Sequence, residues 1–205
     1  MGTNQHYKDR ALKSLEGKWS TAIIATLIYL VITSGLSWSM TVPMGDNLIM
    51  SYSTQGIWTT ICMPLFWGFS IFFLRLIRNE NLDYGRLFDG YKDFLRIFLT
   101  KLLENLAICI GFCLLIVPGI ILAAGLLMTN FILKDDKEIA YIDALKKSWE
   151  MTNGHKGELI WLFLSFIGWI ILSALTFGIG ILFLHPYMQT ALAHYYEDLK
   201  AEQGV

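Results

Sequence analysis

Charged residues are scarce in this 205-residue chain, at 16% of the total, whereas 55% of the residues are hydrophobic and 14% are aromatic. A soluble domain usually carries about a quarter charged residues, and one small core cannot hide this much apolar surface. The mean hydropathy of +0.50 and the net charge of −1 therefore indicate a polytopic membrane protein and give no basis for nucleic-acid binding.

Cysteine is also rare, and the three present, Cys62, Cys109 and Cys113, all lie in apolar runs. Cys109 and Cys113 would share a helix face, but no His or carboxylate stands near them at metal-ligand spacing. We therefore expect no metal site there, and we expect all three thiols to be buried as small hydrophobic groups.

Catalytic motifs are missing as well. The sequence contains no Gly-x-Ser-x-Gly, His-Glu-x-x-His, Gly-x-Gly-x-x-Gly or P-loop lysine motif. His155 and Glu158 could form an acid–base pair, but they stand where a helix would enter the membrane, so we interpret them as part of that entry. We predict no catalytic residue, no cofactor and no metal, and we expect that the protein is not an enzyme.

The amino-terminal segment does not resemble a secretory signal peptide. Its first apolar run begins near Ser20 and continues to about Met40, which is longer than the core of a typical signal peptide. Cleavage near Ser37 or Ser39 is the weaker alternative. We predict an uncleaved first transmembrane helix.

Hydrophobic residues are instead concentrated in six segments. The predicted spans are 20–40, 57–77, 97–117, 119–133, 158–176 and 179–196. The fourth span is short, since fifteen residues reach only about 22 Å. The breaks at Pro118-Gly119 and at Gly178-Ile179-Gly180 are too short and apolar for soluble loops, so both are tight hairpins. The sequence therefore predicts an all-α, single-domain membrane protein over residues 1–205, with six transmembrane helices in three hairpins.

The distribution of basic residues supports this topology. When the six passes are counted, all sixteen Lys and Arg residues fall on one side of the membrane. The other side carries Asp46 and no Lys or Arg. The positive-inside rule then places both termini in the cytoplasm.

The polar stretch before each hairpin shows helical periodicity. Each is predicted to be an amphipathic helix at the cytoplasmic membrane interface, with its apolar face in the headgroup layer. The predicted apolar faces are Tyr7, Ala11, Leu12, Leu15 and Trp19; Leu87, Phe88, Tyr91, Phe94 and Leu95; and Ile139, Ile142, Leu145 and Trp149. We predict a contact surface at Phe88, Tyr91 and Trp149 for anionic lipid headgroups or a protein partner.

Polar residues inside the predicted spans are costly in lipid and usually face a bundle interior or water. Glu104 and Asn105 lie in the third span and Asn130 in the fourth, while His185, Gln189 and His194 follow one another along the sixth. Glu104, Asn130 and His194 would lie in the cytoplasmic half of the membrane and could meet. The set Glu104, Asn105, Asn130, Gln189 and His194 is a candidate proton- or ion-responsive cluster, or a set of ordinary interhelical hydrogen bonds.

Three stretches resemble a bacterial integral-membrane family known as domain of unknown function 975. They are IVPGIILAAGLLMTNFILKDD, DALKKSWEMTNGHKGELIWLFLSFIGW and LTFGIGILFLHPYMQTALAHYYEDL. The matching positions are Pro118, Gly119, Ala144, Leu145, Ser148, Met151, Gly154, Phe166, Gly168, Trp169, Pro186 and Tyr187.

The resemblance covers nearly the whole chain, most clearly residues 97–198. It implies a helical protein of the bacterial cytoplasmic membrane, with no established activity and no catalytic residues to transfer. The second stretch is also similar to the membrane region of some bacterial glycerophosphodiester phosphodiesterases, whose catalytic domain has no counterpart here.

Two functions of different class follow from these features. The first is a non-enzymatic membrane protein that binds a partner or lipid through its cytoplasmic amphipathic helices. The alternative is a small transporter or channel that uses the polar cluster in the inner half of the membrane. A transporter requires a water-accessible cavity at that cluster, whereas a binding protein does not.

Overall fold

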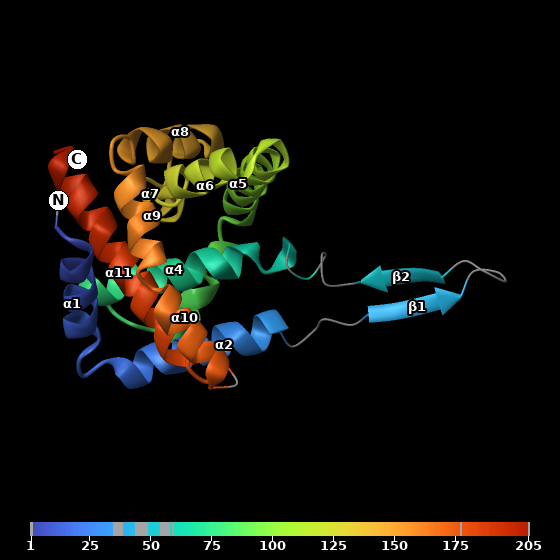
Figure 1. Cartoon of the computed structure of the whole chain (residues 1–205), viewed down its shortest axis with the longest axis horizontal. Helices are drawn as coiled ribbons and strands as arrows, with labels where there is room; N and C mark the ends of the chain where they lie inside the picture. The colour runs from blue at the N-terminus through green and yellow to red at the C-terminus, as the bar shows by residue number, and fades with distance from the viewer. Residues whose placement is uncertain are drawn as a thin grey trace.

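The computed structural model describes residues 2–34, 39–43, 49–53, 58, 60–176 and 178–204. This part of the chain is predominantly helical, as predicted, and it also contains one antiparallel hairpin that was not predicted, formed by β1 and β2 (Figure 1). The elements are α1 (Asn4–Leu15), α2 (Trp19–Ser34), β1 (Ser39–Pro43), β2 (Ile49–Ser53), α4 (Met63–Ile77), η1 (Tyr84–Tyr91), α5 (Phe94–Leu114), α6 (Ile116–Gly125), α7 (Thr129–Asp135), α8 (Tyr141–Met151), α9 (Lys156–Leu164), α10 (Ile167–Leu175) and α11 (Ile181–Glu202).

Three helical stretches in the described residues are long and apolar enough to cross a membrane. They are Phe94–Leu114, Ile116–Asp135 and Lys156–Leu175, and the last two each join two consecutive helices. The pair α1 and α2 would count as a fourth, but it is bent by 98°. These stretches support a membrane protein, while six spans in three hairpins stay a prediction.

The first two predicted spans are shorter as helices than the sequence suggested. Helix α2 ends at Ser34, residues 35–38 lie outside the described part, and positions 39 and 40 belong to β1. Helix α4 begins at Met63, so Pro64 lies in its first turn and not in its interior. A proline is tolerated there because the first-turn N–H groups have no partner within the helix.

The turn between α5 and α6 is tight, but it lies earlier than predicted. The chain breaks at the extended residue Leu115, with φ −163° and ψ 155°, and Pro118 falls within the first turn of α6. Gly119 faces the ring of Phe112, since an added Cβ would lie 2.5 Å from it. At the other predicted hairpin, Gly178 has a φ of +85° between α10 and α11, a conformation that favours glycine.

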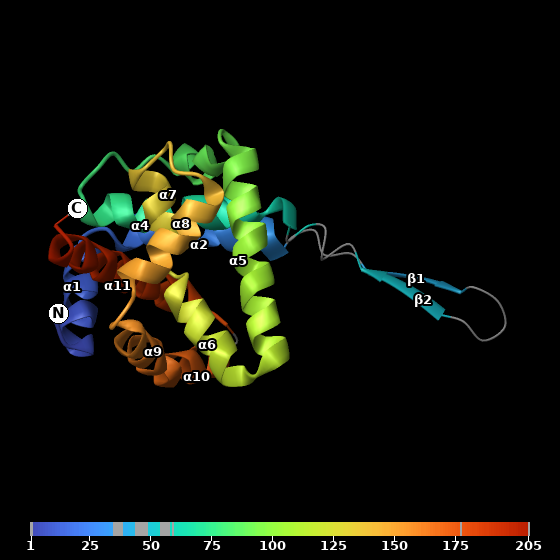
Figure 2. The same ribbon diagram turned by 90° about the horizontal axis from the view of Figure 1, so that it is seen from above.

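Helix α4 forms the centre of the molecule. Twelve of its fifteen residues are buried, including Phe69 and Phe73, which are fully buried. It contacts α2, α5, α7, α11 and η1. Figure 2 shows α5 running across the ends of α2 and α4, not alongside them. The described helices therefore do not form a simple bundle of parallel helices.

The segment η1 lies along α4 and is a 3₁₀ helix. An added Cβ on Gly68 would lie 2.0 Å from the carbonyl oxygen of Leu87, and one on Gly90 would lie 2.3 Å from that of Pro64. A glycine on each side thus allows the two backbones to touch. Of the predicted apolar face, Leu87 is fully buried against the protein, whereas Phe88, Tyr91, Phe94 and Leu95 are exposed. An interfacial position of this stretch stays a prediction.

The other two predicted interfacial helices are present, with different buried faces. Tyr7, Ala11 and Leu15 of α1 are fully buried, and the helix contacts α11, so this apolar face covers protein and not lipid. Helix α8 buries Ala144, Ser148 and Met151 and leaves Tyr141, Ile142 and Trp149 partly exposed.

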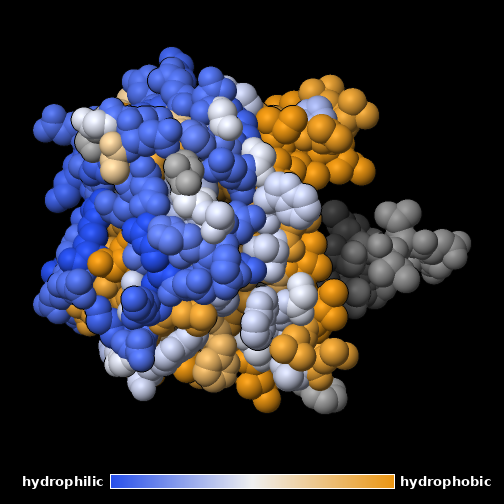
Figure 3. Space-filling model, turned by 60° about the vertical axis from the view of Figure 1, so that its left-hand side comes forward, coloured by the Kyte–Doolittle hydropathy of each residue, from blue (hydrophilic) through white to orange (hydrophobic). Residues whose placement is uncertain are grey.

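Polar and apolar surfaces are segregated. Both termini lie on one side of the molecule (Figure 1), and that side is mainly hydrophilic, with hydrophobic residues gathered towards its edge (Figure 3). The exposed hydrophobic residues include much of α5 and α10. Cys109 and Cys113 lie on the exposed part of α5, so the prediction that they are buried is wrong, whereas Cys62 is buried. Their apolar surroundings reflect an outward face of α5 and not the core.

Candidate functional site

The structure records a separate partner for each of three residues of the predicted polar cluster. Glu104 pairs with Lys101, Asn130 donates from Nδ2 to Ser70 Oγ at 3.3 Å, and His194 Nε2 lies 2.8 Å from Ser14 Oγ. Within the described residues, no recorded hydrogen bond or ion pair joins Glu104, Asn130 and His194 to one another. Each residue is held by a different neighbour.

Two members of the predicted set and a neighbouring histidine have buried atoms without a hydrogen-bond partner in the protein. These atoms are Asn130 Oδ1, Gln189 Oε1 and His185 Nδ1. The His185 ring stacks on Phe69 at 4.9 Å and on Tyr29 at 5.7 Å between centroids. The aromatic contacts show that His185 is packed as a core ring.

Glu104 and Asn105 line a cavity of about 530 Å³ between α2, α4 and α5. The other lining residues are Tyr29, Thr33, Cys62, Met63, Phe66 and Lys101. The cavity forms where α5 crosses the ends of α2 and α4 (Figure 2). Its volume lies within the range of roughly 300–1,000 Å³ that is common for small-molecule sites.

The charged part of this cavity is an ion pair within one turn of α5. Lys101 Nζ donates to Glu104 Oε2 at 2.7 Å, and the two side chains are 5% and 13% exposed. Lys101 Nζ also lies 5.4 Å from the centre of the Phe66 ring. Sequence reasoning singled out Glu104 but treated Lys101 as a topology marker, although the three-residue spacing already predicts that the pair shares a helix face.

The predicted contact surface is divided between two places. Phe88 and Tyr91 are 43% and 36% exposed, with ring centroids 6.3 Å apart, and the Tyr91 hydroxyl donates to the Ile61 carbonyl at 3.0 Å. Trp149 is 38% exposed and lies on α8. The structure records no contact between Trp149 and the other two rings.

Trp149 packs against Lys156 of α9 and Gly125 of α6. Lys156 Nζ lies 3.8 Å from the centre of its ring, and an added Cβ on Gly125 would lie 2.3 Å from a ring carbon. Ser148 donates a hydrogen bond to the Gly125 carbonyl at 2.9 Å. One face of the indole is therefore covered by protein, and the rest of its side chain is exposed, as are Tyr141 and Ile142 on the same helix.

His155 does not show the geometry of a catalytic base. Its Nδ1 lies 3.5 Å from Glu158 and its Nε2 lies 3.7 Å from Glu202, and Nδ1 is buried without a hydrogen bond. The Tyr195 hydroxyl donates to Glu158 at 3.1 Å. These contacts are consistent with the predicted role of this stretch at the entrance to α9.

A network of ion pairs at the polar side was not predicted. Arg78 contacts both Asp135 oxygens at 2.6 and 2.8 Å, and its Nε donates to Glu197 at 2.7 Å. Lys200 and the Tyr196 hydroxyl also donate to Asp135, at 2.7 and 3.1 Å. The network joins the carboxyl ends of α4 and α7 to α11. Its residues are far apart in the sequence, so no regular spacing could have predicted it.

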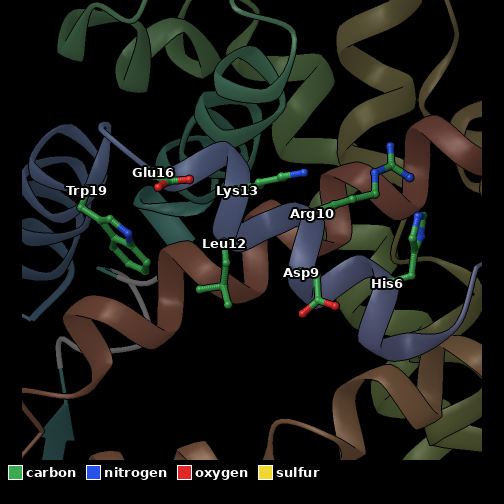
Figure 4. Close-up of a pocket in the computed structure, with 7 residues that line it drawn as sticks. All are labelled: His6, Asp9, Arg10, Leu12, Lys13, Glu16 and Trp19. Atoms are coloured by element: carbon green, nitrogen blue, oxygen red, sulfur yellow. The ribbon is translucent and has the colours of Figure 1, made fainter.

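A shallow hollow on α1 does not have the form of a binding site. It is lined by His6, Asp9, Arg10, Leu12, Lys13, Glu16 and Trp19. Figure 4 shows Asp9 and Leu12 pointing to one side of α1 while Arg10 and His6 point to another. Arg10 is already paired with Asp198 at 2.8 Å. The side chains do not converge on a common point.

Comparisons with known proteins give a family and no function. The family model described as "Protein of unknown function (DUF975)" matches residues 110–203. Comparisons with curated proteins and with solved structures found no match. The resemblance to this family is confirmed, whereas the resemblance to glycerophosphodiester phosphodiesterases is not supported.

Proposed function

The family model matches residues 110–203, and we propose that the chain is a non-enzymatic integral membrane protein that binds anionic lipid headgroups. The binding surface is the exposed face of α8. The membrane is the inner membrane of a bacterium, and the headgroups are those of its cytoplasmic face.

The observation that carries the proposal is the composition of the α8 surface. Tyr141, Ile142 and Trp149 are 38%, 46% and 38% exposed, an arrangement that suits the boundary between headgroups and acyl chains. Lys146, whose side chain is 68% exposed, and Lys147 lie on the same helix. Basic residues next to interfacial aromatics attract anionic lipid, with about 1 kcal/mol for each Lys or Arg near the surface.

Six membrane passes with both termini in the cytoplasm are part of the proposal. The one-sided distribution of Lys and Arg and the two tight hairpins support it. Helices α2 and α4 have 16 and 15 residues, about 24 and 22 Å at 1.5 Å per residue, so each would cross only within a thinned region or inside the protein.

Cysteine labelling tests the topology. In a background without the three native cysteines, Asp46→Cys is expected to react with a membrane-impermeant maleimide in intact cells, and Lys200→Cys only after the membrane is opened. Equal labelling of the two positions in intact cells would refute the proposed topology.

Lipid retention tests the binding surface. Purified protein carrying Lys146→Ala and Lys147→Ala should retain several-fold less phosphatidylglycerol than the wild type in native mass spectrometry. Lys92→Ala, at a side chain that is 80% exposed on a different segment, is the matched control. If the double variant retains as much lipid as the control, α8 is not the binding surface. A protein partner lost with the same variant would favour the protein-binding alternative.

A small transporter or channel is a second candidate, favoured by the cavity at Lys101 and Glu104. Intramembrane charged residues commonly face a substrate or ion pathway. Proteoliposomes should then show a proton or ion flux that Glu104→Gln and Glu104→Ala reduce. A flux that neither variant changes, or no flux above that of empty vesicles, would remove this candidate.

A further inference from the structure

We propose that the cavity between α2, α4 and α5 binds the head group of a zwitterionic phospholipid that carries a primary ammonium, that is, an ethanolamine phosphate group. This site is separate from the α8 surface. It rests on the proposed membrane location, but not on the anionic-lipid binding of α8.

Both members of the ion pair in the cavity keep unused hydrogen-bonding capacity. A lysine ammonium has three N–H donors, and one of those of Lys101 goes to Glu104 Oε2. Within the described residues, no further hydrogen bond of Lys101 or Glu104 is recorded. Since both side chains line the cavity, the remaining donors and the second carboxylate oxygen are available to a ligand there.

The net charge of the pair decides the charge of the ligand. Lys101 and Glu104 sum to zero, and they are 5% and 13% exposed. A ligand with a net charge would leave an uncompensated charge at a site that is poorly solvated, which is strongly unfavourable. A zwitterion can place its phosphate against Lys101 and its ammonium against Glu104, so that every charge has a partner.

The polar neighbours favour a primary over a quaternary ammonium. The free oxygen of Glu104 and the amide oxygen of Asn105 both accept N–H donors, which a quaternary ammonium does not have. The rings of Tyr29 and Phe66 at the cavity would stabilise a cation of either kind. The difference between the two head groups therefore comes from hydrogen bonds to Glu104 and Asn105.

The size and position of the cavity favour a lipid over a soluble molecule. A volume of about 530 Å³ accommodates a head group but not two acyl chains as well. On α5, next to the pair, Leu102 and Leu106 are 42% and 54% exposed, and this helix is one of the candidate membrane spans. The acyl chains can lie along this exposed face while the head group enters the cavity.

Native mass spectrometry of the purified protein tests the proposal with four probes at equal concentration: phosphatidylethanolamine, phosphatidylcholine, phosphatidylglycerol and soluble glycerophosphoethanolamine, a net-neutral phosphodiester. The wild type should retain at least about tenfold more phosphatidylethanolamine than phosphatidylcholine. Glu104→Gln and Lys101→Met should each reduce its retention by about tenfold or more, since each leaves one ligand charge unpaired. The α8 double variant, Lys146→Ala with Lys147→Ala, should retain as much phosphatidylethanolamine as the wild type.

Asn105→Leu provides a second variant if the charge changes impair folding, because Asn105 is exposed and makes no recorded hydrogen bond in the described structure. It should lower phosphatidylethanolamine retention and leave phosphatidylcholine unaffected. Equal retention of the two lipids by the wild type, or an unchanged preference in Glu104→Gln, would overturn the proposal.

The two lipid proposals can fail separately. If the α8 variant loses phosphatidylglycerol while Glu104→Gln and Lys101→Met leave phosphatidylethanolamine retention unchanged, the cavity site is refuted and the α8 surface stays in place. Displacement of phosphatidylethanolamine by an equal concentration of glycerophosphoethanolamine would overturn the lipid assignment and identify a soluble ligand of the same chemistry.

Discussion

Helix α4 and the stretch formed by α9 and α10 have similar hydrophobic composition but opposite surroundings. Twelve of the fifteen residues of α4 are buried inside the protein. In Lys156–Leu175, 22% of the eighteen residues in its most apolar part are buried, and the same figure holds for α5. Hydropathy measures how unfavourable water is for a segment, so it does not distinguish a helix covered by protein from one covered by lipid.

The buried fraction of each helix distinguishes the two cases. It also determines how much each side chain contributes to the stability of the protein. A large apolar side chain in α4 packs against other side chains, so its removal leaves a cavity. A side chain on the outer face of α10, such as Ile171, is about half exposed, so its removal leaves no enclosed cavity. The following predictions test this difference, from the largest expected effect to the smallest.

The largest difference is expected between Phe73→Ala in α4 and Ile171→Ala in α10. Phe73 is fully buried and contacts the rings of Phe69 and Phe72, so its loss should lower the free energy of unfolding by about 3–5 kcal/mol. Ile171 is 57% exposed, and its replacement should change stability by less than about 0.5 kcal/mol. Thermal unfolding of both variants in the same detergent measures the difference, and equal shifts would contradict the comparison.

The ion-pair network should give the next largest effect. Asp135→Asn leaves Arg78 and Lys200 without their shared carboxylate and should cost about 2–3 kcal/mol. Asp143→Asn is the matched control, because Asp143 is 62% exposed and lies 3.6 Å from Lys146. Chemical unfolding should show destabilisation of the first variant alone. A similar effect of the two would mean that the network does not hold the end of α4.

Replacing a glycine by alanine should have opposite effects on stability in α4 and in α10. Gly68→Ala would force a Cβ against the Leu87 carbonyl oxygen and should cost about 1–3 kcal/mol. Gly168→Ala in α10 meets no atom within 4 Å and should be neutral or stabilising, by up to about 1 kcal/mol, because alanine favours the helix. Opposite shifts in the melting temperature are expected, and a stable Gly68→Ala variant would contradict the packing of η1 on α4.

The smallest effect concerns acid stability. Burial opposes ionisation of the Asp89 carboxyl, but hydrogen bonds from Lys92 and Arg75 outweigh it and hold its pKa below the usual value. The stabilisation is therefore complete above the pKa of the unfolded chain, about 4, and is lost as the pH falls through the lower pKa of the folded state. Melting temperatures measured against pH should fall less steeply in acid for Asp89→Asn than for the wild type. Identical slopes would exclude this role.

The sequence predicted the kinds of structural element well and their surroundings less well. The helical character, the two tight hairpins and the amphipathic stretches at α1 and α8 follow from periodicity and from glycine and proline positions. The position of η1 does not, because it depends on close backbone contacts with α4. The prediction that Cys109 and Cys113 are buried was wrong because apolar neighbours in the sequence are compatible with both a protein core and a lipid-facing surface. The same ambiguity applies to α4.

The candidate site was predicted in part. Glu104 and Asn105 do line a cavity, since a carboxylate in an apolar span rarely faces lipid. No hydrogen bond recorded in the described residues joins them to Asn130 or His194, and His194 lies beside Ser14 of α1. The crossing of α5 over the ends of α2 and α4 could not be read from the sequence.

The position of α4 also has a consequence for biogenesis. Ribosomes make the chain from its amino end, so α4 emerges before α7 and α11, which form much of its surroundings in the finished protein. The part of its apolar surface that α7 and α11 cover is therefore unprotected by its own chain until those helices are made. During that interval an insertase or lipid must shield this part of α4, and α11, the last helix to be made, completes the surroundings of α4.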